Sequence, residues 1–178
     1  MKKLHVIIYI LYCFNAVSQQ VPRNSEVMQL TLPKGAIKLN NEEYRKFISK
    51  RYDKSNLADF RDHVYKKDGL LIYYLNSAIS SSKFKRSLES SQAIMVGVFK
   101  QYSKTIIVDS AKIITVNNIR FSIIKYHENN IWYIRFTSDY SKNLRFVNGF
   151  IEYKKPDEQI AQKALHELLH SMHFRNQH

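Results

Sequence analysis

The stretch from residue 105 to residue 153 decides the fold: TIIVDSAKIITVNNIRFSIIKYHENNIWYIRFTSDYSKNLRFVNGFIEY. β-Branched and aromatic residues form runs at residues 106–116, 119–126, 131–137 and 144–153. Between the runs lie Asn, Asp, Ser and Glu residues, at 117–118, 127–130 and 138–139, which favour tight turns. Short connections join antiparallel neighbours, so the stretch predicts a four-stranded antiparallel meander.

A helix is expected directly after this meander. Pro156 fits the first turn of a helix, where its fixed φ and missing N–H are tolerated. Apolar residues then recur at helical spacing and would form one stripe that packs on the sheet, namely Ile160, Ala161, Ala164, Leu165, Leu168 and Met172.

A second amphipathic helix is expected toward the N-terminus. Asn40 or Asn41 can cap it, and Glu42 and Glu43 fill its first turn. Its apolar side chains follow at helical spacing, namely Tyr44, Phe47, Ile48 and Tyr52. Residues 57–65 are expected to form a further short helical piece.

Two more elements are expected between residues 68 and 102. Asp68 and Gly69 favour a turn, and the apolar and aromatic run at residues 70–75 predicts a strand. Residues 87–102 predict a helix, although Gly97 weakens it. The side chains expected to turn inward from that helix are Leu88, Ile94, Met95, Val98 and Phe99. The predicted fold class is α+β, an antiparallel meander sheet packed between N-terminal and C-terminal helices in an α/β/α sandwich.

The first eighteen residues have the pattern of an export signal. Lys2 and Lys3 precede an apolar run shorter than the ~20 residues that span a bilayer, and small residues follow at 16–18. We therefore expect a signal peptide at residues 1–18, a flexible lead-in at residues 19–27 and a single globular domain at residues 28–178. A retained N-terminal anchor is the alternative.

Cys13 is the only cysteine, and it lies within this signal. Tyr12 precedes it at a position where lipid attachment requires a small residue, so we expect a freely soluble exported protein. Cleavage would leave the domain without a disulfide, a thiol nucleophile or a cysteine metal ligand. The expected location is the periplasm or the cell exterior.

The chain is strongly basic, with 28 Lys and Arg residues against 15 Asp and Glu residues and a formal net charge of +13. Such an excess favours contact with polyanions, whether acidic glycan, nucleic acid or an anionic membrane surface. The basic residues occur in short separate clusters, at 45–46, 50–51, 83–86 and 154–155. No tract is long enough for a nucleic-acid-binding arm, so a solvated surface is favoured and no specific nucleic acid is expected.

One motif suggests a chemical activity. Residues 166–170 are HELLH and match the H-E-x-x-H pattern of zinc proteases, in which two histidines bind zinc and the glutamate activates water. His166, Glu167 and His170 would take these roles. A catalytic zinc also needs a third protein ligand. Only eight residues follow His170, and they contain neither a glutamate nor the extension that supplies a third histidine. A third ligand from upstream in the chain is left open.

Helical geometry argues against the motif as well. His166 and His170 would project away from the apolar stripe and into solvent, whereas a catalytic metal is usually bound in a cleft. Four of the seven histidines lie in the last thirteen residues, which makes a chance match easier. The alternative is weak capture of a transition metal by His166, His170 and His173 on one exposed helical stripe.

Other catalytic patterns are weaker. His63 beside Asp62 and His127 beside Glu128 could act as general bases, but an isolated histidine next to an acid is more often solvated. The sequence has no nucleophile elbow, phosphate loop or dinucleotide fingerprint, and only 4 glycines. We assign no catalytic, cofactor-binding or metal-binding residue and expect no cofactor.

The layout of these segments resembles a known family. Residues 32–35 (LPKG) precede the first capped helix, the meander has a central Asn-Asn turn, and residues 149–153 (GFIEY) and Asp157 lead to a closing helix ending in residues 168–174. This layout is similar to small exported bacterial proteins of the PsbP-like superfamily, which includes the photosystem II extrinsic subunit, a Ran-binding nuclear import factor and the envelope protein DcrB.

The resemblance covers about residues 28 to 174 and implies an antiparallel sheet sandwiched by helices. Members resemble binding or assembly proteins, so it carries over no functional residue and makes the HELLH motif incidental. The strong basicity of this chain departs from the family and leaves the class of partner open.

The expected function is therefore that of an exported, non-enzymatic binding or assembly protein of the bacterial envelope. Its expected partner is another envelope protein or an anionic surface component. Two alternatives stay open, a polyanion-binding module and a small zinc-dependent hydrolase that uses the HELLH motif. The partner's identity and the oligomeric state are left open.

Overall fold

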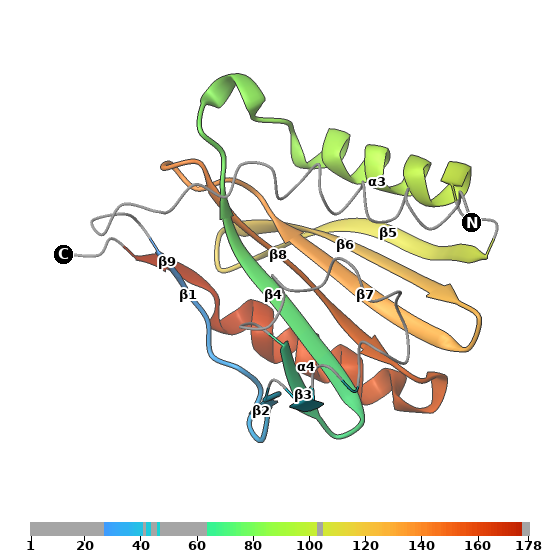
Figure 1. Cartoon of the computed structure of the whole chain (residues 1–178). Coiled ribbons are helices and arrows are strands. Elements are labelled where there is room, and N and C mark those ends of the chain that lie inside the picture. The colour runs from blue at the N-terminus through green and yellow to red at the C-terminus, as the bar shows by residue number, and fades with distance from the viewer. Residues whose placement is uncertain (1–26, 41, 44–45, 47–63, 103–104, 176–178) are drawn as a thin grey trace.

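A computed structural model describes residues 27–40, 42–43, 46, 64–102 and 105–175. Its elements are β1 (Val27–Gln29), β2 (Ile37–Lys38), β3 (Val64–Lys67), β4 (Leu70–Ala78), the 3-10 helix η2 (Ser82–Phe84), α3 (Leu88–Tyr102), β5 (Ile106–Val116), β6 (Ile119–Glu128), β7 (Ile131–Ser138), β8 (Arg145–Tyr153), the 3-10 helix η3 (Lys155–Asp157), α4 (Glu158–Ser171) and β9 (His173–Arg175). These residues include a seven-stranded sheet and a two-stranded sheet (Figure 1).

The predicted meander is confirmed. The order of the large sheet is β2-β3-β4-β8-β7-β6-β5, with every neighbouring pair antiparallel. Asn117 and Asn118 form the tight turn between β5 and β6, with φ angles of 50° and 62°. Asparagine tolerates this left-handed conformation better than most residues, which explains why the turn was visible in the sequence. The α+β class is confirmed with it.

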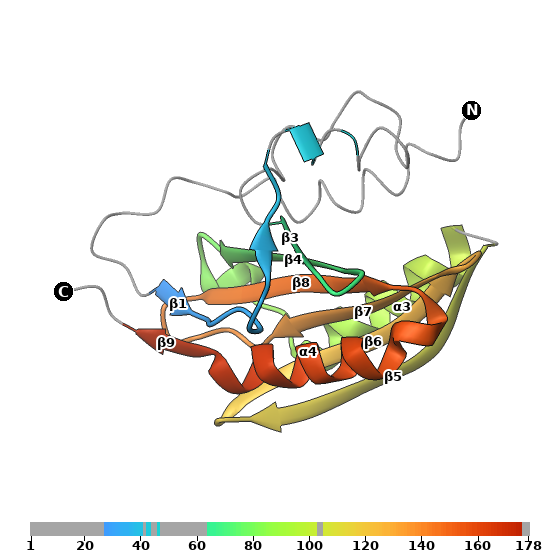
Figure 2. The ribbon, with the colours of Figure 1, turned by 90° about the horizontal axis from the view of Figure 1, so that it is seen from below.

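Two helices cover opposite faces of the sheet, as Figures 1 and 2 show. We call these the α4 face and the α3 face. The fully buried residues of the α4 face alternate along the central strands and pack under α4, namely Phe121, Ile123, Ile134, Phe136, Val147 and Ile151. α4 contributes Ala161, Ala164, Leu165, Leu168, Leu169 and Met172 to the same cluster. Burial of this apolar surface is the main favourable term in the fold.

Both helices bury narrower stripes than the sequence predicts. Ile160 of α4 and Ile94 of α3 are 40% and 42% exposed, so their expected inward positions were wrong. Leu88 and Met95 are the buried apolar residues of α3. The far edge of an amphipathic stripe stays in solvent when the sheet under the helix is too narrow to reach it.

The expected helical piece at residues 57–65 is wrong at its C-terminal end. Val64 and Tyr65 belong to strand β3, where Val64 pairs with Tyr73 of β4. Asp68 and Gly69 close this hairpin with φ angles of 45° and 82°. A tight turn of this kind pairs the residues before it with those after it as two strands. This pairing outweighs the weak helical pattern of the preceding residues. Residues 57–63 lie outside the described residues.

The start of the expected N-terminal helix is present. The Asn40 side-chain oxygen accepts hydrogen bonds from the backbone N–H groups of Glu42 and Glu43, at 3.0 and 2.9 Å. The Glu43 carboxylate accepts from the Asn40 N–H at 3.1 Å, which completes a capping box. The rest of that helix lies outside the described residues, as do residues 1–26 with the predicted signal peptide. Within the described chain, α3 is the helix on the second face.

Glycine is needed at residue 149 and not at residue 97, which gives a matched pair of substitutions. A β-carbon on Gly149 of β8 would lie 2.3 Å from the Tyr73 carbonyl oxygen and 2.4 Å from Cζ of Phe136. We expect Gly149→Ala to lower the free energy of unfolding by about 1–3 kcal/mol or more, because the backbone oxygen belongs to the β4–β8 ladder and cannot retreat.

Gly97→Ala is the control, because a β-carbon there meets nothing within 4 Å. Gly97 lies in the interior of α3, so alanine should raise the free energy of unfolding by about 0.5–1 kcal/mol. Urea denaturation followed by circular dichroism measures both effects. Equal effects in the two variants would contradict the close packing inferred at residue 149.

Candidate functional site

The HELLH motif lies on the outer surface of α4. His166 and His170 are exposed, as predicted, and their ring centroids are 3.9 Å apart. Glu167 points to a different neighbour, since its Oε2 lies 4.0 Å from Nζ of Lys67. The motif therefore presents two adjacent imidazoles on an exposed helical surface, with the glutamate turned toward a lysine.

His173 does not join these two histidines, and the expected three-histidine stripe is wrong. α4 ends at Ser171, and His173 belongs to β9. Its Nδ1 lies 3.0 Å from the Ser171 carbonyl oxygen and its Nε2 lies 3.1 Å from Oε1 of Gln29. In the described part of the chain, no three potential metal-ligating side chains come together.

His127 has an acidic partner that the sequence did not reveal. Its Nδ1 lies 3.1 Å from a carboxylate oxygen of Asp109, which sits at an irregularity in β5. Glu128, the neighbour of His127 in the sequence, does not pair with it, because adjacent strand residues face opposite sides. Glu128 instead accepts a hydrogen bond from the Thr105 hydroxyl at 2.5 Å. His63 and Asp62 lie outside the described residues.

The contacts of His127 do not complete a catalytic group. The Trp132 ring stacks on the imidazole with centroids 5.2 Å apart. Lys155 lies 5.7 Å from the centroid of the same indole ring. Asp109 and Trp132 orient the imidazole, but neither supplies a nucleophile. Stacking and charge pairing at the sheet surface account for these residues.

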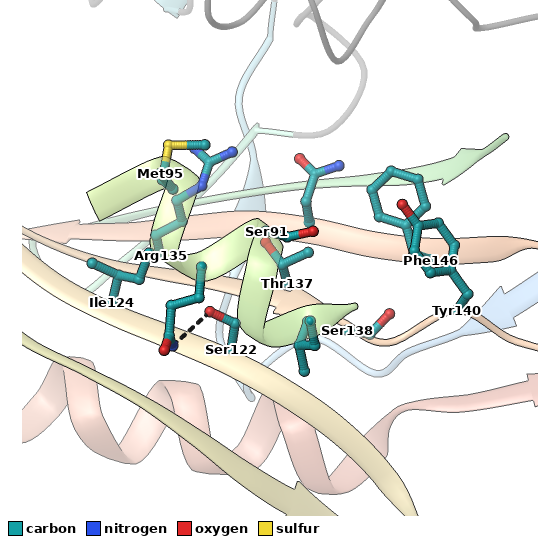
Figure 3. A pocket seen from close by; sticks show the side chains of 12 residues that line it. Ser91, Met95, Ser122, Ile124, Arg135, Thr137, Ser138, Tyr140 and Phe146 are labelled. Atoms are coloured by element: carbon teal, nitrogen blue, oxygen red, sulfur yellow. Dashed lines mark hydrogen bonds between the residues drawn. The ribbon is translucent and has the colours of Figure 1, made fainter. Parts of the chain in front are cut away.

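A cavity of about 30 Å³ lies between α3 and the sheet (Figure 3). Its lining residues come from α3, β6, β7, β8 and the connection after β7, and they are Leu88, Ser91, Gln92, Met95, Ser122, Ile124, Arg135, Thr137, Ser138, Tyr140, Phe146 and Asn148. The volume is enough for a few water-sized groups. Unlike the apolar layer under α4, this lining mixes polar side chains with apolar ones such as Met95, Ile124 and Phe146.

Hydrogen bonds hold the polar walls of this cavity in place. Gln92 of α3 donates from Nε2 to the Ser122 hydroxyl at 2.9 Å, the dashed line in Figure 3, and to the Lys112 carbonyl oxygen at 3.0 Å. Asn148 donates from Nδ2 to the Ser77 hydroxyl at 3.2 Å. The Gln92 bonds attach α3 to the sheet, and the Asn148 bond joins β8 to β4. Together they fix the directions of neutral donors and acceptors around the cavity.

Arg135 is the one charged residue of the lining. It pairs with Ile124 across β6 and β7, and its side chain rises beside Met95 of α3 (Figure 3). Desolvation by the surrounding protein lowers the pKa of its guanidinium, and the tyrosines at positions 126 and 73 offset this only in part. No carboxylate of the described residues contributes to that pKa, so the cation is desolvated without an acidic partner.

The composition of the lining limits its chemistry. It contains no Asp, Glu, His, Cys or Lys residue, and therefore no general base and no usual metal ligand. Burial raises the pKa of the Tyr140 hydroxyl, which keeps that group a hydrogen-bond donor. The serine and threonine hydroxyls lack a base that could activate them. The cavity can bind, but its own residues do not support catalysis.

Sequence reasoning missed this cavity. Arg135 stands in the run IWYIRFTS, which was assigned correctly as a strand, and a charged residue in an alternating strand usually faces solvent. Among the described elements, α3 is the helix that covers this side of the sheet and encloses that position. The usable signal was the set of polar residues on the alternate positions of three successive runs, namely Ser122, Arg135, Thr137 and Asn148.

No protein-family model and no curated protein matches the chain at the sequence level. Solved structures do match. LpqN of Mycobacterium tuberculosis, involved in cell envelope biogenesis, has a TM-score of 0.54 and 10% identity, and the match covers 93% of this chain and 96% of LpqN.

Two further structures match equally broadly. Cyanobacterial PsbP from Synechocystis has a TM-score of 0.50 and 10% identity, with 88% of this chain and 96% of that chain covered. PA94 from Pseudomonas aeruginosa, a protein of unknown function, has a TM-score of 0.50 and 8% identity, with 90% and 88% covered. Identities this low establish the fold alone. The predicted resemblance is confirmed at that level, and the chain has a PsbP-like fold.

Proposed function

We propose that this protein is a non-enzymatic binding protein of the cell envelope, which holds a carboxylate group of its ligand in the cavity between α3 and the sheet. The observation that carries the proposal is Arg135, a partly buried and desolvated cation without an acid of the described residues beside it. An unpaired desolvated charge is costly, and a bound anion offsets that cost.

The surrounding groups suit an oxyanion. A guanidinium presents its N–H donors in a planar fork that matches a carboxylate. The lining of the same cavity also includes the hydroxyl groups of Ser91, Thr137 and Tyr140. The walls that carry them are already fixed by the hydrogen bonds of Gln92 and Asn148, so little ordering is needed when a ligand binds.

The small volume restricts what enters the cavity. About 30 Å³ accommodates a carboxylate but not the body of a larger molecule. The recognised group is therefore an acidic end group or side chain, and the rest of the ligand lies outside. This agrees with binding to a larger envelope component rather than to a free metabolite.

The envelope location rests on the N-terminal sequence. Residues 1–18 have the basic, apolar and small-residue segments of an export signal. The search for a membrane-spanning helix found none of sufficient length and apolarity in the described part of the chain. LpqN, which has a similar fold, is involved in cell envelope biogenesis, and this supports the same compartment for the present protein.

Arg135→Met separates a binding role from a structural one. Methionine is an unbranched apolar side chain, shorter than arginine, that removes the charge and can pack beside Met95 and Ile124. We expect the free energy of unfolding to rise by about 1 kcal/mol or more. We also expect the variant to lose the binding of acetate and N-acetylglycine, followed by NMR shifts of the amides of Ser91 and Thr137.

Two controls accompany this variant. Arg135→Lys keeps the charge but loses the fork, so carboxylate binding should weaken without disappearing. Lys100→Met removes an exposed charge from α3 and should change neither quantity. The proposed function is wrong if Arg135→Met is less stable than the wild type and the wild type shows no carboxylate-dependent shifts in the cavity.

Elemental analysis tests the enzymatic alternative. Two imidazoles one turn apart supply two ligands, whereas zinc sites in proteins use three or four. Untagged protein purified without chelator should therefore contain zinc far below one equivalent, and His170→Ala and Glu167→Gln should not change the content. A full equivalent of zinc that is lost in His170→Ala would contradict a non-enzymatic function.

A further inference from the structure

The connection between β4 and α3 carries the chain's most exposed aromatic side chain among the described residues. We call residues 80–87, with the sequence SSSKFKRS, the Phe84 loop. It includes η2 and projects away from the sheet beyond the start of α3 (Figure 1). Phe84 is 65% exposed at this projection. A single exposed apolar side chain is common on protein surfaces, so Phe84 gains meaning only from the groups around it.

The exposure of Phe84 is built into an ordered turn. The Ser81 hydroxyl accepts a hydrogen bond from the Lys83 N–H at 3.3 Å. The backbone N–H groups of Phe84 and Lys85 donate to the carbonyl oxygens of Ser81 and Ser82, both at 3.0 Å. The phenyl ring is therefore presented by a fixed backbone, and little conformational entropy is lost when it makes a contact.

Three cations surround the ring. Lys83, Lys85 and Arg86 are all exposed, and the sequence has no acidic residue between Asp68 and Glu89. The two nearby acids of the described residues are already engaged: Glu89 forms an ion pair with Arg120, and Asp139 lies 3.7 Å from the same guanidinium. The positive charge of the loop is left uncompensated within the described structure.

One contact attaches this charged turn to the body of the protein. Nζ of Lys85 lies 5.8 Å from the centroid of the Tyr140 ring, at the edge of cation–π distance. Arg86 is near the same tyrosine and favours its ionised form. The loop thus keeps its orientation relative to the sheet while its outer side stays free.

We propose that the Phe84 loop is a contact site for the anionic surface of a lipid bilayer. An aromatic side chain that enters the boundary between headgroups and acyl chains, together with flanking lysine and arginine on anionic headgroups, is the chemistry of interfacial membrane binding. One ring and three cations on a convex turn are far fewer than the roughly 20–30 residues a side of a stable protein interface. A bilayer, unlike a protein partner, can accommodate a convex turn without a pocket of complementary shape.

Phe84, Lys83, Lys85 and Arg86 do not line the α3 cavity, although Lys85 and Arg86 lie near Tyr140, which does. The proposed membrane contact does not require carboxylate binding. Membrane contact through the loop would also determine where the cavity lies. The loop runs directly into α3, whose first residue, Leu88, lines the cavity. Docking through the loop would hold the cavity close to the membrane surface.

Co-sedimentation with lipid vesicles tests the proposal. The probes are vesicles of phosphatidylcholine alone and vesicles that also contain phosphatidylglycerol, at low and at raised salt. We expect the wild-type protein to bind only the vesicles with phosphatidylglycerol, more weakly as salt rises. Phe84→Ser should weaken this binding about tenfold, and a triple variant of Lys83→Gln, Lys85→Gln and Arg86→Gln should weaken it tenfold or more.

Matched controls locate the effect. Ile37→Ser removes another large hydrophobic side chain, 70% exposed on β2. A second triple variant, Lys100→Gln, Lys112→Gln and Lys163→Gln, removes three exposed charges elsewhere. Every variant has the same N-terminal residues, so differences between them report the substituted surface. Both controls should bind as the wild type does, with all thermal unfolding midpoints unchanged.

Three results would overturn the proposal. If both triple variants weaken binding equally, only net charge matters and the loop has no special role. If the loop triple weakens binding but Phe84→Ser does not, the loop binds polyanions such as nucleic acid or an acidic protein and does not enter a bilayer. Absence of wild-type binding to phosphatidylglycerol vesicles at low salt would exclude membrane contact by this surface.

Discussion

The ring of Phe136 lies against Gly149 of the neighbouring strand, and the layer beneath α4 depends on that contact. The two residues face each other in the register of β7 and β8. Because residue 149 has no side chain, the fully buried ring occupies that space, and the Tyr73 carbonyl oxygen of β4 approaches from the other side. A glycine in a strand has no side chain to pack, and the aromatic ring fills the space that this leaves. α4 then closes the layer, with Leu168 fully buried.

Neighbouring residues of β7 belong to two different faces of the sheet. Along β7, Ile134 and Phe136 face α4, whereas Arg135 and Thr137 face α3. Alternation lets one strand supply both sets, because neighbouring residues point to opposite sides. The apolar α4 face supplies the burial energy, so the α3 face can hold a polar cavity with a desolvated cation. On the α4 face, an arginine would be buried within the apolar core, where neither water nor a ligand could contact its charge.

The features predicted correctly are those that depend on residues close together in the sequence. Strand limits and the turn at Asn117 followed from alternation and from backbone conformations that few residues tolerate. The inward sides of the helices were predicted less well, since Ile94 and Ile160 depend on how far the sheet extends beneath each helix. The partner of His127 and the surroundings of Arg135 depend on residues from distant strands and from α3. Contacts between residues that lie far apart in the chain leave no pattern of sequence spacing from which they could be predicted.

The placement of acids around α3 connects the cavity with the Phe84 loop. Arg120 engages both Glu89 and Asp139, so these carboxylates neutralise neither Arg135 nor the loop. Two sets of cations on the same side of the molecule therefore lack acidic partners within the described structure, and their surroundings differ. Interactions of the desolvated Arg135 are weakly screened by salt, whereas those of the exposed loop are screened within about 10 Å at moderate ionic strength. If both proposals hold, anion binding at the cavity should survive raised salt, whereas anion binding at the loop should be lost.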